Sequence, residues 1–161
     1  MGLSGRIATV LTVSDGVSKG AREDLSGDAL TSSLEAEGYE VRRDLVPDEH
    51  DLIVAAIERG AERSALVVTT GGTGFGSRDV TPEATLQVLD REAPALIQAM
   101  VAAGLQSTPM AALSRARAGI VGACLVVNVP GSPQGATESL GAILDVIPHA
   151  LALLAGESTH H

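Results

Sequence analysis

The sequence predicts an α/β fold, a three-layer sandwich in which a mainly parallel sheet carries helices on both faces. Apolar runs rich in valine, isoleucine and leucine alternate with amphipathic stretches along the chain, as they do in βαβ units. The central runs are apolar at almost every position, which is typical of strands covered on both faces. A length of 161 residues favours a single domain over residues 1–161, and we expect residues 156–161 to form a flexible C-terminal tail.

The first half of the chain predicts strands and helices in alternation. In chain order they are a strand over 6–14, a helix over 26–37, a half-exposed strand over 40–45, a helix that ends near residue 63 and a short apolar strand over 65–70. Gly38 suits the position after a helix, where the backbone is often left-handed. Either Asp48 or Asp51 can cap the second helix. The apolar strand should lie at the centre of the sheet.

The second half predicts further helices and a pair of strands. In chain order they are a helix over 81–90, a helix over 94–105, two strands on either side of Gly122 and a closing helix. Thr81 has the properties of an N-cap, Pro82 those of a first helical residue and Glu83 those of an acid in the first turn. Pro148 should kink or split the closing helix.

The composition excludes several classes of function. A net charge of −9, with Lys19 as the single lysine, argues against a broad surface for nucleic acid or acidic membranes. No apolar run approaches the ~18 residues that cross a bilayer, and the N-terminal residues resemble a first strand more than a signal peptide. We therefore expect a cytoplasmic protein with no nucleic-acid or membrane partner. His160 and His161 are either native or the remainder of an expression tag.

The scarcity of aromatic residues predicts an aliphatic core. Tyr39 and Phe75 are the two aromatics, and Phe75 either packs on the ring of a ligand or anchors its own loop. Cys124 stands alone inside the apolar run ACLVVNV, which excludes a disulfide framework or a cysteine-based zinc site and favours a buried thiol.

A ligand site is predicted at one edge of the sheet. Four expected strands are followed by polar or glycine residues, at 14–16, 46–49, 70–74 and 128–135. Ligands of open α/β sheets bind at the carboxyl ends of the strands, near the point where the strand order reverses. Four loops should therefore meet at one site.

The most informative of these loops is VVTTGGTGFGSRDVTPEA at residues 67–84. This sequence matches neither the Walker A motif nor the dinucleotide-binding fingerprint. The fingerprint would need glycine or alanine where Ser77 stands. Glycines let backbone amides approach the oxygens of an anion, and the following helix adds partial positive charge. The alternative is a tight turn in which glycines serve only positive φ angles.

Three acids at this edge have two interpretations each. Asp15, Asp48 and Asp79 could be caps or ion-pair partners, or they could jointly hold Mg²⁺, which binds carboxylates, water and substrate phosphates. Ser132 could cap the last long helix, donate to a phosphate, or do both. The candidates for countering substrate charge are Arg22, Arg78 and Arg115.

The reaction class follows from what is present and what is missing. No Ser-His-Asp pattern is evident and the one cysteine lies in a strand, so covalent catalysis is not expected. A phosphate-binding loop beside acids indicates phosphoryl or nucleotidyl transfer, in which positioning and charge neutralisation supply most of the catalysis.

Several motifs, in the same order, closely resemble the molybdenum cofactor biosynthesis family that includes MogA, MoaB and the G domain of gephyrin. They are TVSDG, GAREDLSGDAL, LVPDE, VVTTGGTGFGSRDVTPEAT, REAP, LSRARAGIVG and LVVNVPGSPQG. The resemblance covers residues 10–154. It implies a MogA/MoaB-like sandwich, usually a homotrimer, and an adenylyltransferase that moves AMP from Mg-ATP to the terminal phosphate of molybdopterin and releases pyrophosphate.

The resemblance also implies site residues. Asp48 and Asp79 would be the catalytic acids and would hold Mg²⁺ while the pterin phosphate attacks the α-phosphorus in line, with no protein nucleophile. Molybdopterin synthase and a molybdenum insertase would be the protein partners. The expected substrate-binding residues are Ser14, Asp15, Thr70, Gly71, Gly72, Thr73, Gly74, Arg78, Thr81, Pro82, Glu83, Asn128, Pro130, Gly131 and Ser132.

Two other functions fit the same resemblance. MogA-type members often have Ser-Asp-Arg after the first strand, whereas this chain has Ser-Asp-Gly at 14–16, a spelling nearer to MoaB and gephyrin. The missing arginine is either replaced by Lys19 or Arg22 or not needed. The first alternative is a catalytically weak molybdopterin-binding or scaffold protein of the MoaB type. The second is a nucleotide-cleaving enzyme related to competence-damage proteins.

Overall fold

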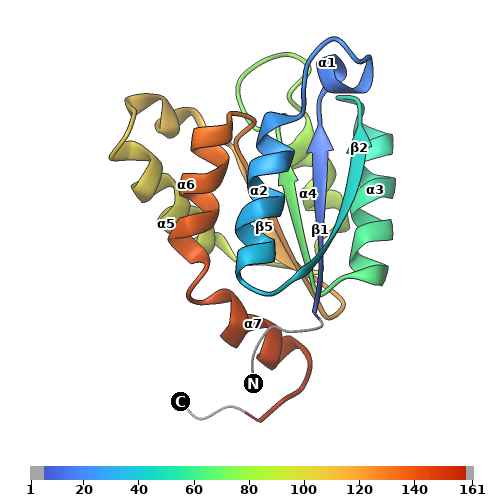
Figure 1. The fold of residues 1–161 in the computed structure, drawn as a ribbon, viewed down its shortest axis with the longest axis vertical. Coiled ribbons are helices and arrows are strands. Elements are labelled where there is room, and N and C mark those ends of the chain that lie inside the picture. The colour runs from blue at the N-terminus through green and yellow to red at the C-terminus, as the bar shows by residue number, and fades with distance from the viewer. Residues whose placement is uncertain (1–5, 159–161) are drawn as a thin grey trace.

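A computed structural model describes residues 6–158 and arranges them in three layers (Figure 1). Its central sheet has the strand order β2-β1-β3-β6-β5-β4. β1, β2, β3 and β6 run parallel, whereas β5 is antiparallel to β6 and β4 is antiparallel to β5. The prediction of a mainly parallel sheet is confirmed. The strands are β1 (Ile7–Val13), β2 (Glu40–Val46), β3 (Leu66–Thr70), β4 (Arg91–Glu92), β5 (Ala118–Val121) and β6 (Cys124–Val129).

Helices cover both faces of this sheet (Figure 1). α2, α6 and α7 pack on one face with part of α5, and α3 and α4 pack on the other. The helices are α1 (Asp15–Ser18), α2 (Leu25–Ala36), α3 (His50–Arg63), α4 (Thr81–Val88), α5 (Pro94–Leu105), the 3₁₀ helix η1 (Pro109–Leu113), α6 (Pro133–Ile143) and α7 (Ile147–Leu154). The α/β sandwich is therefore confirmed.

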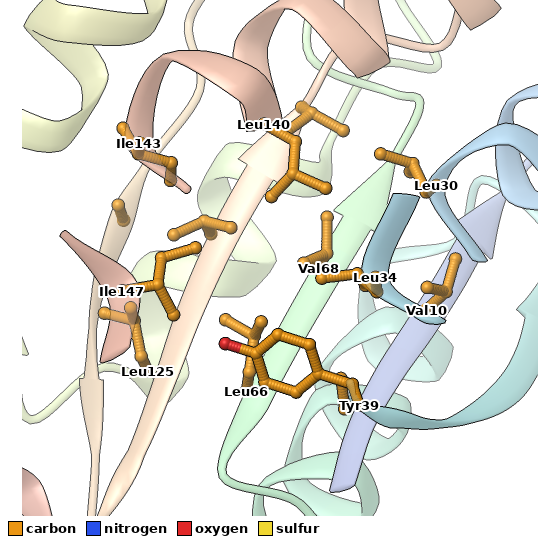
Figure 2. Close-up of a cluster of buried hydrophobic side chains, with 14 of the residues drawn as sticks. Val10, Leu30, Leu34, Tyr39, Leu66, Val68, Leu125, Leu140, Ile143 and Ile147 are labelled. Carbon is orange, nitrogen blue, oxygen red and sulfur yellow. The ribbon is translucent and has the colours of Figure 1, made fainter. Parts of the chain in front are cut away.

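The core is aliphatic, as the composition predicts. On the α2–α6 face, Val10, Val68 and Leu140 belong to one buried cluster (Figure 2). On the opposite face, Val67 packs with Ile57 in a second cluster. Neighbouring residues of β3 thus face opposite layers, because successive side chains of a strand point to opposite sides. Burial on both faces explains why this strand is apolar over consecutive positions.

Two predicted helix starts are wrong. Neither Asp48 nor Asp51 caps α3; the N-cap is Glu49, and its side chain makes no capping hydrogen bond. The Asp48 carboxylate instead accepts from the backbone N–H of Asp15 at 2.9 Å. Thr81 is the first residue of α4 and not its N-cap, which is Val80. The side chains of Asp48 and Thr81 instead make hydrogen bonds to residues farther away in the sequence. The spacing of residues around a helix start does not reveal such bonds.

Other boundaries differ by a turn or less, and three short elements were not predicted. α1, β4 and η1 have four, two and five residues, too few for a periodic pattern. α4 ends at Val88 instead of 90 because the Asp90 N–H donates to Ile120 O at 2.8 Å and begins the edge of the sheet. The split of the closing helix is confirmed: α6 and α7 differ in direction by 64°, and Pro148 lies in the first turn of α7.

Among residues 6–158, no single helix is both long enough and apolar enough to cross a membrane. α6 and α7 satisfy that test only as a bent pair, and their apolar side chains Leu140, Ile143, Ile147 and Leu151 are buried in the core. Of the predicted tail, the structure describes residues up to 158: Glu157 Oε1 accepts from Arg6 at 2.8 Å. His160 and His161 lie outside the described residues.

Candidate functional site

The four predicted loops meet at the carboxyl edge of the sheet, where the parallel strands end together (Figure 1). The strand order reverses between β1 and β3: the chain leaves β1 for α2 on one face and β3 for α4 on the other. Hydrogen bonds join the loops directly. Ser14 N–H donates to Val46 O at 3.0 Å, and Thr70 Oγ1 donates to Pro130 O at 2.7 Å. The topology thus places the site where α/β sheets bind ligands.

The loop after β3 depends on two glycines with left-handed backbones. Gly71 has φ 101° and Gly72 has φ 69°, a region that other residues adopt only with strain. A Cβ at Gly71 would collide with Val13 O, and one at Gly72 would collide with Thr81 Oγ1. Glycine is therefore required here for both conformation and close approach.

Thr81 ties this loop to the start of α4. Its Oγ1 donates to Gly71 O at 2.9 Å, and its N–H donates to Gly72 O at 3.1 Å. The side chain is fully buried. Thr81 thus holds the backbone of the glycine loop, and its expected contact with substrate stays a prediction.

Asp15 and Asp48 lock two loops together. Asp15 N–H donates to Asp48 Oδ2 at 2.9 Å, and Asp48 N–H donates to Asp15 Oδ1 at 3.0 Å. The Arg78 side chain donates two hydrogen bonds to the Asp15 carboxylate, from Nε to Oδ2 and from Nη2 to Oδ1, both at 3.0 Å. The Arg78 hydrogen bonds hold the pKa of Asp15 below its ordinary value. Burial raises the pKa of Asp48, and the nearby Asp15 and Asp79 charges add to that rise.

The predicted three-carboxylate metal site does not form. Asp15 is committed to Arg78, and residues 6–158 contain no group of three or more acidic, histidine or cysteine side chains arranged to hold a metal. Asp48 and Asp79 do line one cavity together. Two carboxylates fit Mg²⁺ when the substrate phosphates and water complete its shell. The pair therefore remains the candidate for holding that ion.

Asp79 folds back over its own loop. Its Oδ2 accepts from Gly76 N–H at 2.8 Å, and a Cβ at Gly74 or Gly76 would lie 3.1 or 2.9 Å from that oxygen. The small residues at 74 and 76 therefore make room for the carboxylate. This requirement accounts for glycines that have no positive φ.

Arg115 does something the sequence did not indicate. It was a candidate for countering substrate charge, but its three nitrogens donate within the protein: Nε to Gly74 O at 2.8 Å, Nη2 to Asp79 O at 2.6 Å and Nη1 to Glu83 Oε2 at 2.6 Å. The last bond holds the pKa of Glu83 below its ordinary value. Of the three arginine candidates, Arg22 lines a cavity at this edge of the sheet.

Two cavities open at this edge. The first has a volume of about 390 Å³ and apolar side chains on one side, among them Ile97, Met100 and Leu113. The second has a volume of about 680 Å³ and a more polar lining that includes Arg22 and Asp48. Four residues line both cavities: Gly72, Asp79, Gly131 and Ser132. The two cavities thus adjoin at the glycine loop and its acid.

The predicted site residues divide between these cavities. The first is lined by Thr73, Gly74, Asn128 and Pro130, the second by Ser14, Asp48, Thr70 and Gly71, in addition to the four shared residues. Five predicted residues line neither: Asp15, Arg78, Thr81, Pro82 and Glu83.

Two polar residues that line the cavities also have structural hydrogen bonds. Asn128 is fully buried, with Nδ2 donating to Thr69 and Thr85 and Oδ1 accepting from Arg117 N–H. Ser132 Oγ accepts from Gly135 N–H at 3.1 Å and caps α6, as predicted. The capping bond leaves the Ser132 hydroxyl hydrogen available for a ligand.

Sequence reasoning missed the apolar wall of the first cavity. Ile97, Met100 and Val101 of α5 line it, yet the sequence PALIQAMVAAGL gives no sign that one side of this helix faces a cavity. Phe75, for which the sequence allows either packing on a ligand ring or anchoring of its loop, is 70% exposed. It lines neither cavity. Its contact with a ligand stays a prediction.

Comparisons with known proteins agree on one family. The family described as "Probable molybdopterin binding domain" matches residues 9–149. The chain is 40% identical over 152 residues to the molybdopterin adenylyltransferase of Helicobacter pylori, covering 91% of this chain and 86% of that protein. It is 39% identical over 150 residues to the molybdenum cofactor synthesis protein cinnamon of Drosophila melanogaster, covering 90% of this chain but only 25% of that longer protein. The crystal structure of the molybdopterin biosynthesis enzyme MoaB from Thermus thermophilus superposes with a TM-score of 0.88 at 47% identity, covering 94% of this chain and 98% of that one.

Proposed function

This chain belongs to the molybdopterin-binding family of molybdenum cofactor biosynthesis, that of MogA and MoaB, and from that premise we propose that it is a molybdopterin adenylyltransferase. One observation carries the proposal: the two cavities adjoin at Gly72, Asp79, Gly131 and Ser132. Such an enzyme brings together two substrates, molybdopterin and ATP, each of which has a ring system and a phosphate. Two adjoining cavities can hold the two ring systems and bring the two phosphates together at their shared wall. The name of the Helicobacter pylori relative supports the same activity.

In the proposed reaction, an oxygen of the molybdopterin phosphate attacks the α-phosphorus of ATP. A new P–O bond forms, the bond between the α- and β-phosphates breaks, and pyrophosphate leaves with the electron pair. No protein nucleophile is needed. Backbone amides of the glycine loop and the Ser132 hydroxyl hold the phosphates near the N-termini of α4 and α6, and the exposed Arg22 in the second cavity adds positive charge.

Asp48 and Asp79 would hold Mg²⁺ beside these phosphates. Each has an oxygen outside the backbone hydrogen bonds described above, Oδ1 in both residues. Mg²⁺ would neutralise charge on the triphosphate. Asp15 would keep the Asp48 backbone in place through the reciprocal hydrogen bonds, with Arg78 holding Asp15 in turn.

A second candidate is a molybdopterin-binding protein of the MoaB type that transfers no AMP. The similarity to MoaB from Thermus thermophilus favours it, as does Gly16 after Asp15. The Arg22 side chain lies where a side chain at position 16 would begin, because a Cβ at Gly16 would lie 2.7 Å from Arg22 Cδ. We propose that Arg22 supplies at this place the charge that an arginine at position 16 would bring.

The cellular setting belongs to the same proposal. A homotrimer in the cytoplasm, receiving the pterin from molybdopterin synthase and passing it to a molybdenum insertase, is what the family resemblance supports. A net charge of −9 is consistent with a small-molecule enzyme that uses neither nucleic acid nor acidic membranes as partners.

The proposal is tested by supplying molybdopterin on its synthase with Mg-ATP and measuring adenylylated pterin by mass spectrometry and pyrophosphate by a coupled assay. We expect both products from the native chain and at least ~100-fold slower formation by Asp79→Asn. The matched control is Asp90→Asn, since Asp90 Oδ2 also accepts a glycine N–H at 2.8 Å, from Gly122, but lines the separate cavity at the other end of the sheet. Tight pterin binding without product would support the MoaB-type alternative, and nucleotide cleavage without pterin would support the competence-damage type.

A further inference from the structure

Arg115 reaches the glycine loop from a distant part of the chain. It lies between η1 and β5, and its side chain donates to Gly74 O and Asp79 O, 41 and 36 residues away. Its own N–H donates to Thr73 O at 2.9 Å. Arg115 therefore holds the segment that bears Asp79 at its beginning and at its end. The third nitrogen binds Glu83 in the first turn of α4.

We propose that Arg115 is a positioning residue that fixes the Asp79 carboxylate at the boundary between the two cavities. The proposal rests on adenylyl transfer as the function of this site, and it assigns to Arg115 a task that acts through Asp79. Asp79 is held at two points. Its carbonyl accepts from Arg115, and its carboxylate accepts from Gly76 N–H inside the same loop.

The chemistry of the side chain suits this task. A guanidinium is planar and presents several donors in fixed directions, so it can hold two carbonyls and a carboxylate at once. A lysine ammonium keeps the charge but cannot reproduce that geometry. Charge-assisted hydrogen bonds are also among the stronger ones. Three of the five N–H donors of Arg115 have acceptors within the protein, and Arg115 lines neither of the two cavities, which disfavours a direct bond to substrate phosphate.

Arg115 also connects the loop to the first cavity. Ser114 and Ala116, its neighbours in sequence, both line that cavity. A ligand that fills the cavity therefore contacts the segment whose arginine holds Asp79. Displacements of about 1 Å can cost about 100-fold in rate even when the substitution is away from the reacting atoms. Loss of this link should thus lower turnover more than it lowers binding.

The test compares Arg115→Lys with Arg117→Lys. Arg117 is two residues away and pairs with the exposed Glu92 at 2.9 Å, so it controls for charge and for general stability. We expect Arg115→Lys to lower kcat by about 10- to 100-fold, with KM for ATP and for molybdopterin changed by less than about threefold. Arg117→Lys should keep both constants near their native values. A rise in KM with unchanged kcat, or equal effects of both substitutions, would overturn the proposal.

A double variant separates positioning from an independent contribution. If Arg115 acts through Asp79, then Asp79→Asn with Arg115→Lys should be no slower than Asp79→Asn alone. Multiplying effects would contradict the proposal. If Arg115→Lys does not fold, Glu83→Gln weakens one of the three side-chain bonds and should shift kcat in the same direction by less; an unchanged kcat with a rise in KM would again overturn it.

A readout without turnover distinguishes this inference from the proposed function. Backbone ¹⁵N relaxation should give order parameters near ~0.85 for residues 76–79 in the native chain and below ~0.6 in Arg115→Lys, with native values in Arg117→Lys. If the native chain transfers no AMP but this difference is found, the proposed function fails and the positioning by Arg115 stands. Equal order parameters in both variants would overturn the positioning whatever the activity.

Discussion

The centre of the sheet and its carboxyl edge are built from the same strands but are held by different forces. In β3, Leu66, Val67 and Val68 are fully buried among aliphatic side chains, whereas the next residues lead to Gly71, whose neighbours are backbone carbonyls and hydroxyls. Apolar burial dominates the first region. Specific hydrogen bonds dominate the second. Stability and chemistry should therefore respond to different substitutions a few residues apart.

The largest effect should come from Asp79→Asn at the edge. We expect kcat to fall at least about 100-fold, because the charge beside the phosphates is lost. The free energy of unfolding should change by less than about 1 kcal/mol, since an asparagine oxygen can still accept from Gly76 N–H. Turnover assays and urea unfolding measure the two quantities. A loss of activity matched by a large loss of stability would remove the distinction between the two regions.

The next largest effect should come from Leu140→Ala in the centre. Leu140 is fully buried in the same cluster as Val68 of β3 and Leu125 of β6 (Figure 2), so its truncation should lower the free energy of unfolding by about 2–5 kcal/mol. The kcat per folded molecule should remain within about twofold, because Leu140 lines neither of the two cavities. Urea unfolding checks the first expectation and active-site titration the second. A destabilisation below about 1 kcal/mol would mean that the core tolerates the cavity.

Gly71→Ala tests the boundary between the two regions and should lower both the stability and the activity. The positive φ of 101° and the collision with Val13 O should cost about 2 kcal/mol of unfolding free energy, and the displaced loop should lose activity as well. Gly141→Ala in α6 is the matched control, because nothing lies within 4 Å of its added Cβ. That control should be neutral or stabilise by up to about 1 kcal/mol. Similar stability for the two variants would contradict the requirement for glycine at 71.

The smallest effect should come from Tyr39→Phe. Tyr39 Oη is buried and has no hydrogen-bond partner among the described residues, so its removal should leave stability at pH 7 unchanged or raise it by up to about 1 kcal/mol. Burial raises the pKa of Tyr39 to about 12. The folded state therefore keeps its phenol proton where the unfolded state has lost it, and native stability should fall as pH rises above about 10. Urea unfolding between about pH 7 and 11 should show less of that fall in Tyr39→Phe.

The sequence predicted the centre of the sheet better than its edge, and the difference has a physical cause. The run Leu66, Val67 and Val68 of β3 is easy to recognise in the sequence, because burial on both faces favours apolar residues at consecutive positions. The polar residues after each strand then indicated the candidate site by topology alone. What Asp15, Asp48 and Arg115 do depends instead on hydrogen bonds between residues that are 32 to 63 positions apart in the sequence. Local spacing contains no information about such bonds.

The most direct test of the central claim is to follow the two ends of the triphosphate in a single turnover. Molybdopterin bound to the native chain would receive ATP labelled at the α-phosphorus in one reaction and at the γ-phosphorus in another, with Mg²⁺. Adenylyl transfer predicts that the α label appears on the pterin and the γ label in pyrophosphate. A γ label on the pterin, or an α label in free AMP beside unmodified pterin, would contradict adenylyl transfer at this edge of the sheet.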